Sequence, residues 1–132
     1  MAIKNENQAF QYALLAAEDL SNATAGTGAV YKAIAADDRK FAANGLEAVG
    51  IICYGGQSGN HITCDTVGQS KFTAGGAVGA GARLTVAGSG YLVAATSGTY
   101  VVGRALETAV ASGAVGAGLF NFATPYFMTS SN

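Results

Sequence analysis

The residues able to do chemistry are few in this sequence of 132 residues. His61 is its one histidine, and its two cysteines are Cys53 and Cys64. Because side chains alternate along a strand, the separation of three between His61 and Cys64 predicts opposite faces, which argues against a nucleophile–base pair. A zinc ion needs about four nitrogen or sulfur ligands, and histidine and cysteine together supply only three. In a reducing compartment both cysteines should stay thiols, so we interpret them as small apolar side chains and not as a disulfide.

The carboxylates do not suggest an acid–base pair either. Asp37 and Asp38 are adjacent, so an extended chain would splay them apart, and together they predict a charged, solvated turn. Glu18 and Asp19 have the same interpretation. No apolar surroundings mark one carboxyl group as a general acid. We therefore expect no enzymatic activity, and a small enzyme built on the histidine or on paired carboxylates is kept only as an alternative.

Segment 74–81 is rich in glycine and invites comparison with a phosphate-binding loop. Such a loop needs a strand before it and a helix after it, whose N-terminus faces the anion. Here the alternating segment Arg83-Leu84-Thr85-Val86 follows, which is typical of a strand. The sequence therefore predicts a tight turn ahead of a strand, and no phosphate site.

The composition favours a folded protein whose surface is partly covered. Half of the residues are apolar and 11% are charged, so the chain is too apolar to be disordered and poor in charge for a free monomer. The other possibility is that uncharged polar residues and glycine make a fully exposed surface hydrophilic. A net charge of −1 without a basic stripe gives no basis for nucleic-acid binding. No apolar run approaches the roughly 20 residues that span a bilayer, and no signal peptide opens the sequence, so we expect no membrane contact.

Short apolar runs separated by glycine turns fill residues 78–122, the pattern of an antiparallel meander. Gly88-Ser89-Gly90 should join segments 84–86 and 91–95 as a hairpin. We expect a mainly β fold, either a small antiparallel β-barrel or a β-sandwich, preceded by an N-terminal arm or short helix. Other predicted strands are 29–35, 46–54, 61–67 and 70–73.

The N-terminal part, 1–28, is expected to be an arm or short helix followed by a loop, and 29–132 to be the β-rich part of one domain. Residues 9–20 leave two alternatives open. They are rich in helix formers, and Phe10, Ala13, Leu14 and Ala17 share a helical face. The same residues could equally form an extended arm that lies along a neighbour.

The C-terminal tail is apolar from Pro125 to Met128. Tyr126, Phe127 and Met128 must be covered, either by the chain's own core or by a neighbouring subunit, because aromatic residues and methionine are enriched at interfaces.

In the order and spacing of its motifs, the sequence resembles the small head decoration, or capsid cement, proteins of tailed bacteriophages. The resemblance covers roughly residues 16–122, and the loop at 109–118 departs from it by being longer and richer in glycine and alanine. The matching segments are Ala16-Ala17-Glu18-Asp19-Leu20, Gly50-Ile51-Ile52, Gly56-Gln57-Ser58-Gly59, 75–86, 90–95 and 102–107.

The resemblance implies a structural protein of the virion without a cofactor, metal or catalytic site. It would be made in the cytoplasm of the host bacterium, form a homotrimer, bind the outside of the phage head and clamp neighbouring major capsid proteins. Under this hypothesis the N-terminal segment contacts the capsid protein and the tail lies at a subunit contact. The candidate contact residues are Ile3, Phe10, Tyr12, Leu14, Tyr126, Phe127 and Met128.

The alternative function is a β-rich module of a phage virion that binds a surface or a glycan. Such a module needs exposed aromatic side chains gathered among polar neighbours. The tyrosines at 12, 31, 54, 91, 100 and 126 are scattered along the sequence, which weighs against it.

Overall fold

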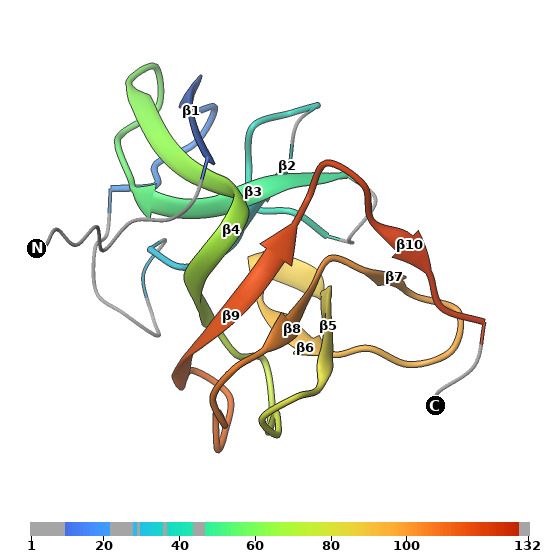
Figure 1. Cartoon of the computed structure of the whole chain (residues 1–132). Coiled ribbons are helices and arrows are strands. Elements are labelled where there is room, and N and C mark those ends of the chain that lie inside the picture. The colour runs from blue at the N-terminus through green and yellow to red at the C-terminus, as the bar shows by residue number, and fades with distance from the viewer. Residues whose placement is uncertain (1–9, 22–27, 29, 36, 44–46, 130–132) are drawn as a thin grey trace, which may run out of the picture.

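The chain folds as a mainly β structure, as the glycine-punctuated pattern predicts (Figure 1). The computed structural model describes residues 10–21, 28, 30–35, 37–43 and 47–129, apart from the side chains of Phe10 and Tyr12. Within these ranges the helical structure is the 3-10 turn η1, Gly88–Gly90. The strands are β1 Phe10–Leu15, β2 Ala33–Ala35, β3 Ala48–Tyr54, β4 His61–Thr73, β5 Arg83–Val86, β6 Leu92–Ala94, β7 Tyr100–Val101, β8 Gly103–Ala105, β9 Val115–Asn121 and β10 Tyr126–Phe127.

Strand β4 is the spine of the fold, with 13 residues. Its first half lies between β1 and β3, and its second half pairs with β9 from Val67 to Thr73. The sequence predicts two separate strands here, 61–67 and 70–73. They form one strand because every second residue from Ile62 to Phe72 is buried except Gly68, so the alternation keeps its phase across the glycine.

The main sheet curls into a nearly closed antiparallel barrel, which decides between the two predicted architectures. Its strand order is β2-β3-β4-β9-β8-β5-β6. A parallel bridge joins Ala74, at the end of β4, to Leu92 of β6, and the Gly90 N–H donates to the Ala42 carbonyl at 2.8 Å. These contacts bring together the two ends of the strand order, near β2 and β6. The predicted hairpin between β5 and β6 is confirmed, with η1 as its turn.

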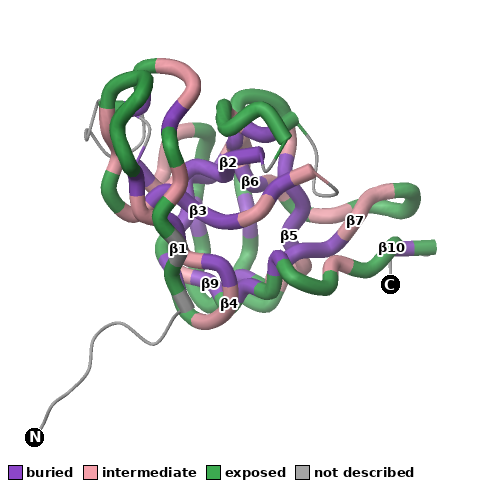
Figure 2. Tube along the Cα trace, turned by 90° about the horizontal axis from the view of Figure 1, so that it is seen from above, coloured by how far each residue is buried: buried purple, intermediate pink, exposed green. Residues whose placement is uncertain are grey.

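Aromatic rings fill the barrel core. Phe72 of β4 meets Phe120 of β9 edge to face at 6.0 Å between ring centroids, and Phe120 stacks on Phe122 at 5.6 Å. All three side chains are buried, and each contributes roughly 1.5–3 kcal/mol of burial energy. Figure 2 shows that the buried residues gather on the strands in the middle of the molecule, with exposed residues in the outer loops.

A second, smaller core lies on the other face of β3 and β4. Ile51 points into the barrel, whereas its neighbour Ile52 belongs to this second core together with Ile62 and Cys64. Ala16 and Leu20 cover it, and both are buried. The segment after β1 therefore closes a hydrophobic cluster of its own chain.

The helix considered for residues 9–20 is wrong, because Phe10–Leu15 form a strand. The extended alternative is right about the conformation, and the described part of this segment lies along strand β4 of its own chain. Strand β1 pairs antiparallel with β4, and the Leu20 N–H donates to the Gly56 carbonyl at 2.8 Å. Pairing with an unoccupied edge of β4 thus overrides the local helix propensity.

The strand predicted at 29–35 is shorter than expected. Tyr31 has a φ of +69°, in the left-handed region, so extended structure begins only at Ala33. Two backbone hydrogen bonds of 2.8 Å hold Tyr31 there, one to Ile52 and one from Thr73.

Candidate functional site

The potential nucleophile and base lie apart, as their spacing predicts. His61 is exposed at the start of β4, whereas Cys64 is fully buried in the second core. Both cysteines are thiols. Burial and, to a lesser extent, the negative charge of Asp65 raise the pKa of the half-buried Cys53 thiol. A thiol that holds its proton is a poor nucleophile at neutral pH.

Asp37 and Asp19 hold local turns, whereas Glu18 bonds to the backbone of a distant segment. Asp37 accepts a hydrogen bond from the Asp38 N–H at 2.8 Å, so the predicted charged turn is present. Glu18 accepts from the Phe41 N–H at 3.0 Å, and Asp19 accepts from Ser21, whose bonds lower the Asp19 pKa. Among the described residues, no three histidine, cysteine, aspartate or glutamate side chains gather as a metal site would require. Within the same ranges, no helix has the length and apolar character that a bilayer crossing demands.

The structure instead gathers exposed apolar side chains around a small two-stranded ribbon. Strands β7 and β10 pair with each other outside the main sheet and stand out from the barrel (Figures 1 and 2). Tyr126 and Phe127 of β10 and Leu119 of β9 are each 50% exposed. With Tyr100 and the exposed Arg104, they define the ribbon surface.

The ribbon is held by a regular backbone pairing and a ring contact. Tyr126 lies opposite Val101, and Phe127 lies opposite Tyr100. The rings of Tyr100 and Phe127 meet edge to face at 5.1 Å. An isolated pair of two-residue strands is unstable in water, so this ribbon depends on its anchors to the barrel.

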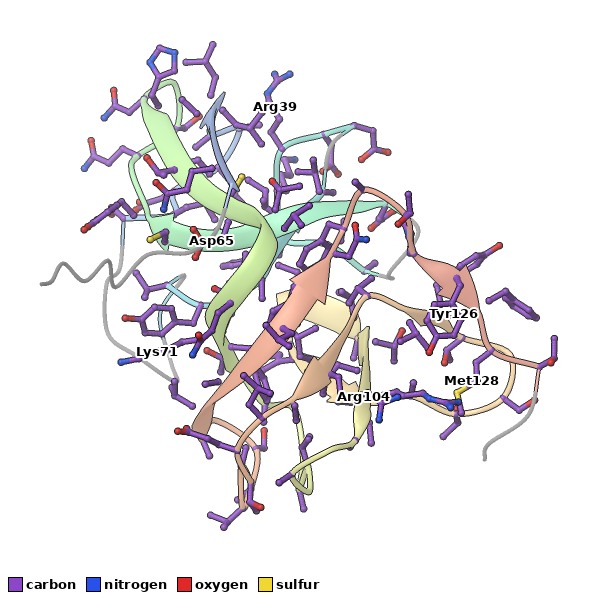
Figure 3. The ribbon with its side chains drawn as sticks, in the orientation of Figure 1. Arg39, Asp65, Lys71, Arg104, Tyr126 and Met128 are labelled. Atoms are coloured by element: carbon purple, nitrogen blue, oxygen red, sulfur yellow. The ribbon has the colours of Figure 1, made fainter. Side chains whose placement is uncertain are left out.

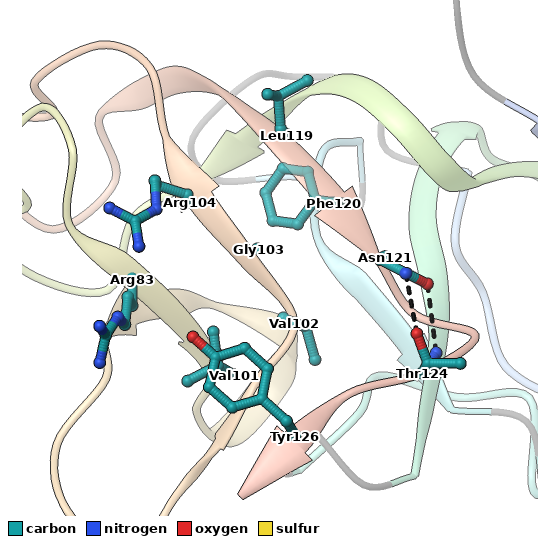
Figure 4. A pocket seen from close by; sticks show the side chains of 10 residues that line it. All are labelled: Arg83, Val101, Val102, Gly103, Arg104, Leu119, Phe120, Asn121, Thr124 and Tyr126. Carbon is teal, nitrogen blue, oxygen red and sulfur yellow. Dashed lines mark hydrogen bonds between the residues drawn. The ribbon is translucent and has the colours of Figure 1, made fainter. Parts of the chain in front are cut away.

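Two anchors fix the ribbon. Met128 is buried beneath it, and its N–H donates to the Thr99 carbonyl at 2.8 Å. At the other end, the Asn121 amide oxygen accepts the N–H groups of Ala123 and Thr124, each at 3.1 Å, and its nitrogen donates to Thr124 Oγ1 at 2.8 Å. This Asx-type turn links β9 to β10 and sets the position of Tyr126 (Figure 4).

A hollow of about 490 Å³ lies between the ribbon and the barrel wall (Figure 4). Arg83 and Arg104 lie directly opposite each other across β5 and β8, and Arg104 Nη1 donates to the Gly81 carbonyl at 3.2 Å. Leu119 and Tyr126 also line the hollow. Tyrosine, arginine and exposed apolar side chains together are typical of protein contact surfaces.

The predicted contact residues have different surroundings. Tyr126 and Phe127 lie together on the ribbon surface, whereas Met128 is buried by its own chain. Leu14 is half-buried against the second core. Phe10 and Tyr12 lie on β1 with side chains outside the described structure, and Ile3 lies outside the described residues altogether.

Sequence reasoning missed Leu119, Tyr100 and Arg104 as members of the same surface. The alternation in the segment Gly-Leu-Phe-Asn-Phe carried a usable signal, because it places Leu119 opposite in direction to Phe120 and Phe122. Nothing local brings Tyr100 to Phe127, since that contact depends on the pairing of β7 with β10.

No protein-family model matches this sequence, and no curated protein matches it. The fold is similar to the crystal structure of the N base of the head fiber protein gp8.5 of bacteriophage phi29. The TM-score is 0.63 at 18% sequence identity, and the match covers 87% of this chain and 96% of that chain. At this identity the similarity establishes a shared fold.

Proposed function

We propose that this protein is a structural component of a bacteriophage virion, a head decoration or cement protein. It binds the outside of the phage head and stabilises contacts between major capsid proteins, and it does no catalysis. The observation that carries the proposal is the shared fold with a base domain of a phage head fiber over nearly the whole length of both chains. The resemblance of the sequence motifs to decoration proteins supports it independently.

The chemistry of the surface agrees with a role in adhesion. The ribbon surface offers aromatic, aliphatic and guanidinium groups on a backbone fixed by hydrogen bonds, so binding costs little ordering entropy. The thiols described above are buried or half-buried, and the carboxylates are engaged in hydrogen bonds to the backbone. A contact surface of this kind needs shape and rigidity and does not need a reactive group.

A stable protein contact buries about 800 Å² per partner, so several elements must act together. We propose that the ribbon surface and the N-terminal segment both take part in contacts with the major capsid protein, and that a second copy of this chain contacts the first in a homotrimer. A trimer presents each contact three times, and the linked contacts strengthen binding through avidity.

Co-sedimentation with phage shells tests this proposal. The purified protein should pellet with expanded shells at a saturating ratio and should raise the temperature at which the shells break. Light scattering should give the mass of a trimer, in solution or after release from shells. A protein that stays in the supernatant at every shell concentration would contradict the proposal.

The N-terminal segment needs a carefully placed truncation. Removing residues 1–15 would delete β1 and expose the edge of β4, so lost binding could reflect lost folding. Removing residues 1–9 leaves β1 complete. Weaker capsid binding by this shorter deletion, with an unchanged melting temperature, would support the arm, and unchanged binding would remove it from the mechanism.

A further inference from the structure

A second hollow, of about 560 Å³, shares no lining residue with the hollow beside the ribbon. Figure 3 shows Asp65 and Lys71 on one side of the barrel, away from Arg104 and Tyr126. Strands β1, β3, β4 and β9 contribute to it. Its lining includes Gln11, Tyr31, Tyr54, Asp65, Gln69 and Lys71.

Asp65 is a fixed hydrogen-bond acceptor in this hollow. Gln11 Nε2 donates to Asp65 Oδ1 at 2.8 Å, and Ser70 Oγ donates to Asp65 Oδ2 at 2.9 Å. Two bonds from two strands hold the carboxylate plane in one orientation. An ionised carboxylate accepts about four hydrogen bonds, so capacity remains on both oxygens for a ligand.

Aromatic side chains stand beside this carboxylate. Tyr54 is 70% exposed, at the end of the largely buried strand β3. Tyr31 is held in its left-handed backbone conformation, and Lys71 Nζ lies 5.7 Å from the centre of its ring. Such strain costs about 1–3 kcal/mol and clusters at functional sites. The fold therefore brings to one hollow two tyrosines that are far apart in sequence.

The polar groups indicate the class of ligand. An exposed aromatic ring offers a face to the C–H groups of a sugar ring. The planar amide and carboxylate groups of Gln11, Gln69 and Asp65 match the adjacent hydroxyl groups of the same ring. Asp65 and Glu107 outnumber Lys71, so the hollow carries an excess negative charge that disfavours an anionic ligand.

We propose that this hollow binds a neutral saccharide, with Tyr54 as the stacking platform and Asp65 as the oriented acceptor. Such a site would add attachment to a glycan-bearing surface to the structural role. It does not depend on capsid binding, because the isolated protein contains the complete hollow.

Saturation-transfer NMR on the purified protein tests the site directly. The probes are the neutral methyl glycosides of glucose, galactose, N-acetylglucosamine and N-acetylgalactosamine and their oligosaccharides, with sialyllactose as an anionic comparison. Saturation should transfer to at least one neutral glycoside, and titration of that glycoside should shift the backbone amide signals of Tyr54 and Asp65. Absence of transfer to every neutral probe would overturn the proposal.

Variants place the binding in the hollow. Tyr54→Ala and the isosteric Asp65→Asn should each weaken the best glycoside about tenfold or more, equivalent to about 1.4 kcal/mol. Tyr54→Phe keeps the ring, and Tyr126→Ala removes a tyrosine of the ribbon surface, so both should bind within about twofold of the parent. Because Tyr54 is largely exposed, its replacement opens no cavity in either core, and a melting curve checks this. Gln69→Ala, also at an exposed position, serves if Asp65→Asn fails to fold.

A basic side chain from another protein is the competing occupant. A trilysine peptide tests it, because its ammonium groups would pair with Asp65 and Glu107. Binding of the peptide without binding of any neutral glycoside would overturn the proposal, as would equal glycoside affinity in the parent and Tyr54→Ala.

Discussion

Gly103 of β8 lies directly opposite Phe120 of β9, and the phenyl ring occupies the space into which a side chain at position 103 would point. A β-carbon on Gly103 would lie 2.5 Å from Phe120 Cδ1 and equally close to the Leu119 carbonyl oxygen. Phe120 in turn packs on Phe72 and Phe122. One strand glycine thus permits the aromatic core that closes the barrel next to the ribbon surface.

Gly103→Ala should therefore destabilise the fold. Overpacking of this kind costs about 1–3 kcal/mol, here because both the ring and a backbone carbonyl must move. Urea unfolding measures the loss. Gly79→Ala is the matched control, since nothing lies within 4 Å of a β-carbon there, and it should change the free energy of unfolding by less than about 0.5 kcal/mol. Equal stability of the two variants would show that the core does not depend on Gly103.

Asn121→Ala should loosen the ribbon while leaving the barrel intact. The variant loses the three hydrogen bonds that hold the turn between β9 and β10, and local opening should become about 1–2 kcal/mol easier. Hydrogen exchange of the Met128 amide reports the ribbon, and the Thr73 amide reports the barrel. Asn121→Asp keeps the acceptor oxygen, so its ribbon should open at a rate between those of the parent and of Asn121→Ala. Equal acceleration at both amides would mean that the turn supports the whole fold.

The alkylation rate of Cys53 should depend on pH. The pKa of its thiol is raised, so the thiol stays protonated to higher pH than an ordinary thiol, and alkylation by iodoacetamide should reach its half-maximal rate at a higher pH than in an unstructured cysteine peptide. Asp65→Asn removes the nearby negative charge and should move this midpoint downward. In the unfolded chain the Cys53 thiol ionises at a lower pH than in the folded protein. The free energy of unfolding should therefore fall as pH rises from the unfolded thiol pKa toward the folded one.

Mass spectrometry checks which thiol reacts. Under native conditions one alkyl group should be added, at Cys53, because Cys64 is fully buried. The Cys53→Ser variant should stay unmodified until it unfolds. Rapid modification at Cys64 in the native protein would contradict the second core as described.

The ribbon surface should carry capsid binding. Replacing both Tyr126 and Phe127 by serine removes its half-exposed rings and should weaken the affinity for expanded shells about tenfold or more. The melting temperature should change little, because neither side chain belongs to the barrel core or the second core. Val110→Ser is the control, since Val110 is 77% exposed outside the ribbon surface and its replacement should leave affinity unchanged. A double variant that binds like the parent would exclude the ribbon as the contact.

Local patterns predicted the strands that show period-two alternation or are joined by a tight turn. Alternation identified the long β4, although as two segments, and Gly88-Ser89-Gly90 predicted the hairpin of β5 and β6. Both depend on period-two burial and on turn residues, which a short window contains.

Features that depend on distant pairing were beyond local patterns. The conformation of 10–15 is decided by the edge of β4, some 50 residues away, so helix propensity misled. The same holds for the meeting of Tyr31 with Tyr54 at one hollow and of Tyr100 with Phe127 on one ribbon. Scattered tyrosines in the sequence are therefore no argument against an aromatic site in the fold.

Electron cryo-microscopy of expanded phage shells incubated with this protein tests the central claim most directly. The account predicts added density on the outer surface of the shell, centred between neighbouring major capsid proteins. In that density Tyr126 and Phe127 should be buried against a neighbouring subunit. Shells that gain no outer density, or density in which the ribbon surface faces solvent on every copy, would contradict it.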